Sequence, residues 1–177
     1  MSLNIDKQLG AIPAASAESR AQMRSNAGGW LTSGTDAQRE AAQRMIDALD
    51  RQEQIEHEAL VGELSGLDTA ERVIRAFTVK PMTETEAKLV QVLLDNPAST
   101  STELTQALGW KAQSWHMHFG TMCADRALYL WPAPDAEHRN GKFYSGILAD
   151  LKEPENLFTM KADVAAAFER LGLRKRG

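Results

Sequence analysis

The chain has 177 residues, a length that suits one domain of ordinary size or a smaller domain with helical extensions. The content of 43% hydrophobic and 25% charged residues is typical of a globular protein. The apolar runs are too short to span a bilayer and no signal-peptide pattern is present, so we expect a cytoplasmic protein. Its single cysteine excludes an internal disulfide or a multi-cysteine zinc module. The net charge of −4 argues against an indiscriminate DNA binder, so DNA binding would require locally placed cations.

Residues 1–35 are rich in Ala, Ser, Gly and Asn and predict a mobile N-terminal arm with a short helix around Glu18–Arg24. A long helical pattern follows over residues 36–64, and its two apolar patches flank a nearly all-polar stretch at 50–58. The patches consist of Met45, Ile46 and Leu49, and of Leu60, Val61 and Leu64. Because the polar stretch is too charged for one small core, we favour a homodimer through this helix; the alternative is that it folds back on its own domain.

Three sequence patterns between residues 68 and 103 mark the starts of helices. Asp68 with Glu71, Thr83 with Glu86 and Thr100 with Glu103 each form the capping-box pattern that opens a short helix. The first of these helices completes a helical extension over residues 36–80. Gly109 supplies a turn after the third, and a further helix is predicted over residues 112–126. Trp115, Phe119, Met122 and Arg126 fall at positions i, i+4, i+7 and i+11, which is the spacing of one helix face.

The pattern changes beyond this helix. Residues 127–131 and 143–151 are rich in aromatic and branched side chains and predict two strands. Residues 157–160 are expected to pair with them across the turn Glu153-Pro154-Glu155-Asn156. The segment 132–142 separates the first two strands and contains the tight-turn pair Asn140-Gly141. A last helix is predicted over residues 162–171, before the basic end Arg174-Lys175-Arg176.

This order of elements resembles a winged helix-turn-helix, and the segment "TSTELTQALGWKAQSWHMHFGTMCADRALYLW" carries the resemblance. It covers about residues 82–171 within a predicted domain of residues 82–177. The fold class expected is therefore mainly α with a small antiparallel sheet, preceded by a helical extension. The resemblance places Leu104 and Leu108 in the core, with Trp115, Phe119 and Met122 as anchors of the third helix. A bulky Trp115 and a long, proline-containing segment between the first two strands depart from the usual pattern.

The resemblance implies a sequence-specific regulator that binds double-stranded DNA, with helix 112–126 in the major groove and the 132–142 wing on the backbone. The outward residue types suit base edges and phosphates, and the basic end could add a sequence-independent contact. The predicted DNA-contacting residues are Lys111, Gln113, Ser114, His116, Met117, Thr121, His138, Arg139 and Lys142. The alternative is a protein-interaction adaptor on the same fold, which the acidic balance favours.

Two other kinds of site find little support. On a helix His116 and His118 lie about 200° apart, and His116 and Cys123 are separated by about 10 Å along the axis. These positions do not converge on one metal ion, so no metal or cofactor is expected. No nucleophile motif or phosphate-binding loop is present, and we expect no enzymatic activity.

Overall fold

The computed structural model describes residues 5–111, 114–137 and 140–176. The chain divides into two compact units, residues 1–65 and 66–177. In the described ranges it is mainly helical with one two-stranded antiparallel sheet, which confirms the coarse fold class. None of the helices there has both the length and the apolar character that a bilayer-spanning segment needs.

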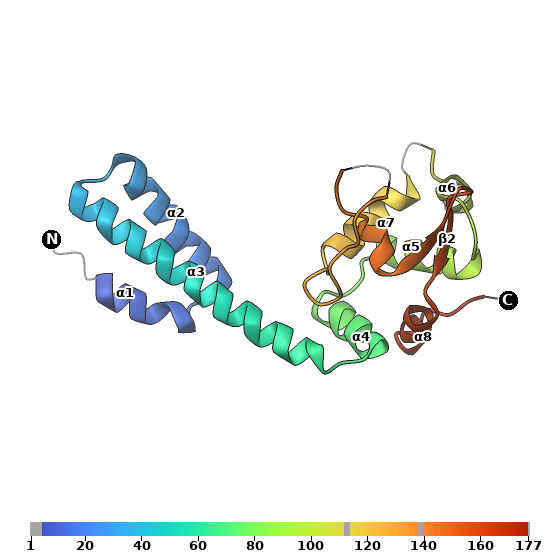
Figure 1. The fold of residues 1–177 in the computed structure, drawn as a ribbon, viewed down its shortest axis with the longest axis horizontal. Helices are drawn as coiled ribbons and strands as arrows, with labels where there is room; N and C mark the ends of the chain where they lie inside the picture. Colours follow the sequence, from blue (N-terminus) through green and yellow to red (C-terminus); the bar gives the residue numbers. More distant parts are fainter. Residues whose placement is uncertain (1–4, 112–113, 138–139, 177) are drawn as a thin grey trace. The chain divides into compact units, whose positions relative to one another are not determined.

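The first unit is a small helical assembly and not a helix with a mobile arm. Its elements are α1 (Ile5–Ala11), the 3₁₀ helix η1 (Ile12–Ala14), α2 (Ala17–Ser33) and α3 (Asp36–Ser65). Figure 1 shows α2 alongside α3, which it contacts. The few apolar residues of the expected arm are spaced to meet α3: Ile5, Ile12 and Ala27 are buried in one cluster with Ala41, Ala42, Met45 and Leu49. Small residues allow close helix packing, so a sparse apolar pattern suffices.

Helix α3 runs unbroken through its polar stretch, and α2 places opposite charges beside it there. Arg20 pairs with Glu56 at 2.6 Å, and Arg24 pairs with Asp50 at 2.8 Å and Glu53 at 2.9 Å. The first apolar patch of α3 is thus covered by α1 and α2 of the same chain. A homodimer through residues 36–64 stays a prediction, and it would have to use what α3 leaves exposed.

The second unit contains the remaining elements. They are α4 (Thr69–Val79), α5 (Glu84–Asp95), α6 (Ser101–Ala107), α7 (Trp115–Ala124), η2 (Tyr144–Ile147), β1 (Ala149–Lys152), β2 (Leu157–Met160) and α8 (Ala162–Arg170). All three predicted capping boxes are confirmed, at the starts of α4, α5 and α6. The unit begins at Gly66, so α4 belongs with it and not with the N-terminal extension as predicted; α4 packs on α8.

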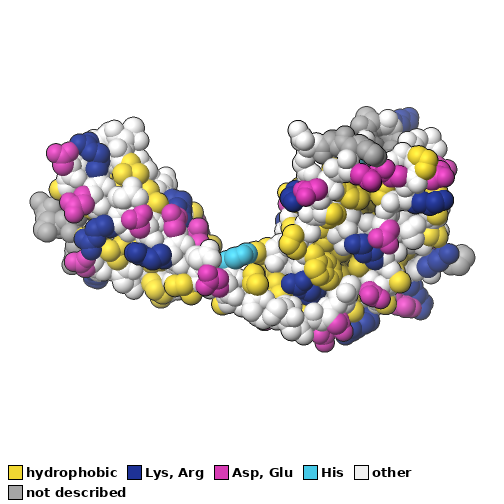
Figure 2. Space-filling model, in the orientation of Figure 1, with side chains coloured by type: hydrophobic (Ala, Val, Ile, Leu, Met, Phe, Trp, Pro, Cys, Tyr) yellow, Lys and Arg dark blue, Asp and Glu magenta, His cyan; other side chains and the backbone are white. Residues whose placement is uncertain are grey.

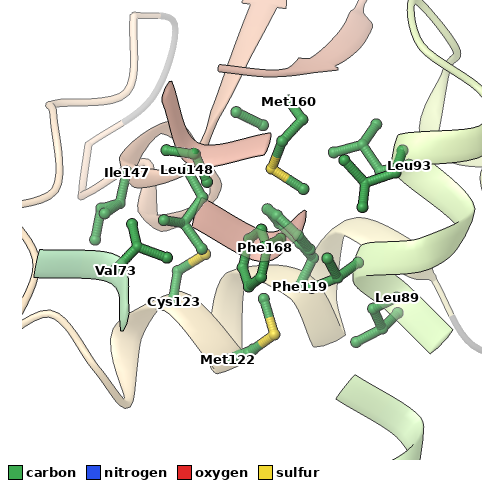
Figure 3. Close-up of a cluster of buried hydrophobic side chains, with 14 of the residues drawn as sticks. Val73, Leu89, Leu93, Phe119, Met122, Cys123, Ile147, Leu148, Met160 and Phe168 are labelled. Atoms are coloured by element: carbon green, nitrogen blue, oxygen red, sulfur yellow. The ribbon is translucent and has the colours of Figure 1, made fainter. Parts of the chain in front are cut away.

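One apolar core holds these elements together. Side chains from α4, α5, α7, α8 and β2 meet in it, and Figure 3 shows Phe119, Met122 and Cys123 of α7 near Phe168 of α8 and Leu89 of α5. Phe77 of α4 lies edge-on to Phe168, with ring centroids 5.0 Å apart. The apolar face predicted for the third helix is thereby confirmed as a core face.

The sheet confirms the predicted pairing of residues 157–160 and differs from the prediction in the two strands before them. Strand β1 pairs with β2 in the register Ala149↔Met160 to Lys152↔Leu157, and Phe158 also forms a bridge with Ser99, just before α6. Residues 127–131 form turns instead of a strand, and the predicted second strand begins with η2. Gly146 lies within η2, and an added Cβ there would come within 2.5 Å of the Phe143 ring, so this winding requires glycine at that position.

The predicted wing is consequently misplaced. The loop of the hairpin is the turn 153–156 between β1 and β2. The segment predicted as the wing, 132–142, lies before η2, and its residues Asp135 and Lys142 pair in an isolated bridge. The paired strands are connected by Glu153-Pro154-Glu155-Asn156, the turn across which residues 157–160 are predicted to pair, and this part of the prediction is confirmed.

Candidate functional site

The junction between α6 and α7 is built from side-chain bonds to backbone amides. The Trp115 N–H donates to Thr105 Oγ1 at 2.9 Å, and the His116 N–H donates to Ser101 Oγ at 3.3 Å. A second bond of 2.8 Å joins Ser101 Oγ to His116 Nδ1. The side chain of the N-cap residue, Ser114, makes no capping bond. Side chains of α6 therefore satisfy the first two amides of α7, which in many helices are left for an anion.

Trp115 fixes the orientation of α7. Its indole Nε1–H donates to Leu89 O at 3.1 Å, its ring stacks on Phe119 at 4.5 Å, and Phe158 meets it edge-on at 5.1 Å. A buried indole needs such an acceptor, and here a carbonyl within α5 provides it. Trp115 is fully buried, as expected, and the opposite side of α7 is directed outward.

The outward side of α7 is uncharged. Met117 is 61% exposed, and Thr121 is exposed with its hydroxyl donating to Met117 O at 3.0 Å. His118 lies half-buried with its ring edge-on to Trp110 at 5.1 Å. No Lys, Arg, Asp or Glu occurs anywhere in the α7 sequence WHMHFGTMCA. The helix thus presents a neutral surface with an apolar side chain at its centre.

The structure brings together only part of the predicted DNA-contacting set. Lys111 is exposed ahead of α7, while Ser114 and His116 are half-buried at its start. Lys142 is 2.7 Å from Asp135, so its charge is compensated within the same segment. Three further members, Gln113, His138 and Arg139, lie outside the described residues.

The hairpin turn is acidic. Glu153 and Glu155 occupy it, and Lys152 lies 3.8 Å from Glu155. On the face drawn in Figure 2, lysine and arginine side chains among the coloured residues are interspersed with carboxylates and do not form one basic patch. The hairpin turn therefore carries more negative than positive side chains, which disfavours contact with phosphates.

A groove of about 680 Å³ runs beside β1, and sequence reasoning missed it. It lies between the starts of α6 and α7, the segment 134–137 and the β1–β2 hairpin. Its lining includes Ser101, His116, Phe143, Leu151 and Phe158, with carboxylates from Asp135, Glu137, Asp150 and Glu153. The alternation of Asp150 with Leu151 on β1 was the available signal, but the neighbours of that strand could not be identified from sequence.

The structure places His116, His118 and Cys123 in three different environments. Among the described residues, no group of three or more His, Cys, Asp or Glu side chains could hold a metal ion. His116 bonds to Ser101, and His118 packs on Trp110. Cys123 is buried in the core, and this burial raises the pKa of its thiol far above the ordinary value. A thiol in that state is a poor nucleophile and a poor metal ligand.

Comparison of the chain with protein-family models, curated proteins and solved structures finds no match. Its function therefore has to be inferred from the side chains presented on its surface, since a fold by itself does not define a function.

Proposed function

We propose that the protein is a non-enzymatic protein-interaction module, built on a winged helix-turn-helix, in which the outward side of α7 contacts a partner protein. The succession of α5, α6 and α7 and then the β1–β2 hairpin supports this fold. So does the bridge between Ser99 and Phe158, which ties the segment before α6 to the hairpin.

The observation that carries the proposal is the neutral outward side of α7. The central part of a protein interface is depleted of charged residues and enriched in Met and aromatic side chains. Met117 is 61% exposed on this helix, and the adjoining segments expose Leu128 at 50% and Tyr144 at 40%. A protein partner would gain from covering such side chains, whereas nucleic acid would gain little.

Phosphate contacts would be weak at this surface. DNA affinity comes largely from Lys and Arg that neutralise phosphates, and α7 has neither. The amides of Trp115 and His116 are already bonded to α6. The carboxylates of the hairpin turn would repel a phosphate strand.

DNA binding stays the second candidate because Lys111 is exposed immediately ahead of α7. The small side chains of Gly120 and Thr121 would also allow a DNA strand to approach the helix closely. In that case α7 would enter the major groove, Gln113 would read an adenine edge and Lys111 would contact a phosphate. The protein would then be a transcriptional regulator.

A photo-crosslinking experiment tests the main proposal. A photoreactive phenylalanine analogue replaces Met117 in the full chain, expressed in the cells from which the protein comes, and crosslinked products are identified by mass spectrometry. We expect one defined protein adduct. The matched control carries the same analogue at Val79, an apolar residue 45% exposed on α4, and should give no adduct with that protein. Absence of a specific adduct at Met117 would reject the proposal.

Fluorescence anisotropy with pooled genomic DNA fragments tests the second candidate at low and moderate salt. A DNA-binding protein should select some fragments over random DNA. Gln113→Ala should then lose about 1–3 kcal/mol of sequence discrimination, whereas Lys111→Ala should weaken all sequences alike and lower the salt slope by about one. If binding is absent at low salt, DNA binding is excluded.

A further inference from the structure

We propose that the groove beside β1 binds an extended, arginine-bearing segment of the partner protein, which adds to the sheet as a strand next to β1. This inference rests on the proposed function in so far as the partner is a protein. It concerns a different surface from the outward side of α7 and can be tested separately.

The first argument is that β1 has an unpaired edge. Phe158 exchanges both of its backbone hydrogen bonds with Ser99, at 2.8 and 3.3 Å. Leu151 lies opposite Phe158 in the register, and pairs in an antiparallel ladder alternate between bonded and non-bonded. The N–H and C=O of Leu151 therefore point away from β2, towards the outer edge. Lys161 N–H donating to Leu148 O at 3.1 Å gives Ala149 the same orientation.

These outward backbone groups have no partner among the described residues. The only strand that pairs with β1 in that part of the chain is β2. An exposed strand edge offers a row of donors and acceptors to another extended chain, and addition of a strand is a common mode of peptide recognition. Ala149, Asp150 and Leu151 all line the groove, so this edge opens onto it.

The second argument is charge. Asp150 and Glu137 line the groove, both are exposed, and neither forms a hydrogen bond or an ion pair within the described ranges. Lys161, the one lysine among the lining residues, donates to the carbonyls of Gly146 and Ile147 at 2.7 and 3.3 Å and is thus already engaged. Within the described part of the chain, Asp150 and Glu137 thus give the groove two carboxylates without a bonded partner.

The third argument is the apolar floor. Phe143, Leu151 and Phe158 line the groove together with the carboxylates. An arginine side chain suits this combination, because its stem packs on apolar surface while its planar guanidinium forms two parallel bonds with a carboxylate and stacks on aromatic rings. An alternating sequence of arginine and aliphatic residues in an extended segment would match both features.

The test uses the full chain labelled with ¹⁵N and the peptide acetyl-Leu-Arg-Val-Arg-Leu-amide, followed by NMR titration. We expect saturable shifts confined to amides of β1 and the lining of the groove. The exchange of the Leu151 amide with solvent should slow by about tenfold, as expected for a newly bonded amide. The same peptide with glutamate in place of arginine should not bind, nor should one with N-methylated backbone amides.

Two variants separate a local contact from general charge. Asp150→Asn should weaken peptide binding by about tenfold, the effect of losing one charge-assisted pairing. Glu155→Gln makes the same change in charge on the hairpin turn but outside the lining, and should change the affinity less than twofold. Equal effects of the two variants, equal binding of the glutamate peptide or unsaturable shifts would overturn the inference. A specific adduct at Met117 together with failed peptide binding would reject the groove alone and leave the proposed function standing.

Discussion

At the scale of single residues, Arg126 is the most heavily bonded side chain of the second unit's core. It is fully buried, and its guanidinium donates to both carboxylate oxygens of Glu86 at 2.8 and 3.1 Å and to the carbonyls of Lys80, Pro81 and Met122. Burial raises the pKa of Glu86, but the bonds from Arg126 and from the Thr83 backbone outweigh it, so the pKa is lowered overall. This ion pair ties the end of α7 to the start of α5.

We predict that Glu86→Gln lowers the free energy of unfolding by about 3 kcal/mol, because it leaves a buried guanidinium without its counter-charge. Glutamine keeps an oxygen for the cap at Thr83, so the loss reports the charge. Urea denaturation at neutral pH measures it. The control Glu84→Gln disrupts a pair with Lys88 that is exposed to solvent and should have a much smaller effect. Equal effects would contradict the assignment.

The same pair predicts a dependence on pH. Because the pKa of Glu86 is lower in the folded than in the unfolded chain, its stabilisation is fully present above the ordinary carboxyl value and is lost as the pH falls through the lowered folded value. Between pH 6 and the acid limit, the wild-type chain should therefore lose more stability than the Glu86→Gln variant. Urea midpoints collected across this range test the prediction, and parallel curves would refute it.

At the scale of elements, the junction of α6 and α7 depends on Thr105. Its hydroxyl accepts from the Trp115 N–H at 2.9 Å and donates to Ser101 O at 2.7 Å. We predict that the isosteric change Thr105→Val destabilises the protein by about 1–2 kcal/mol, since the amide of Trp115 is left unsatisfied in a partly buried place. Thermal unfolding measures this loss.

Thr121→Val is the matched control for that change. It also removes a hydroxyl bonded to a helix carbonyl, but on the outward side of α7, and it leaves no amide without a partner. Its unfolding temperature should stay close to that of the wild type. If both variants unfold at the same temperature, the bond at the junction does not carry the energy assigned to it.

Elements that are specified locally were predictable from sequence, and those that depend on distant partners were not. The three capping boxes need only residues three positions apart, and all three are present. The hairpin was predictable as well, because its strands are joined by a short turn. The packing of α2 and the bridge beside β2 depend on distant partners: Ala27 is buried in one cluster with Ala41 and Ala42 of α3, and Phe158 pairs with Ser99. The same holds for the candidate site: the outward residues of α7 were predicted from the sequence, whereas the groove beside β1, which is formed by distant segments, was not.

At the scale of the whole molecule, the two units have separate cores that share no residue. We predict that a fragment of residues 66–177 folds by itself and unfolds cooperatively, as monitored by near-ultraviolet circular dichroism. A fragment of residues 82–177, the boundary expected from sequence, lacks α4. It would lose Val73 and Phe77 from the core and should be markedly less stable. Equal stability of the two fragments would contradict the placement of α4.

The burial of Cys123 has a practical consequence for experiments on the intact chain. It is the only thiol in the sequence, and it lies within the core of the second unit. A thiol-reactive dye should therefore leave the native chain unlabelled and react only when this core opens. The labelling rate in dilute denaturant would then report the opening of that unit alone, without a fragment or an introduced probe.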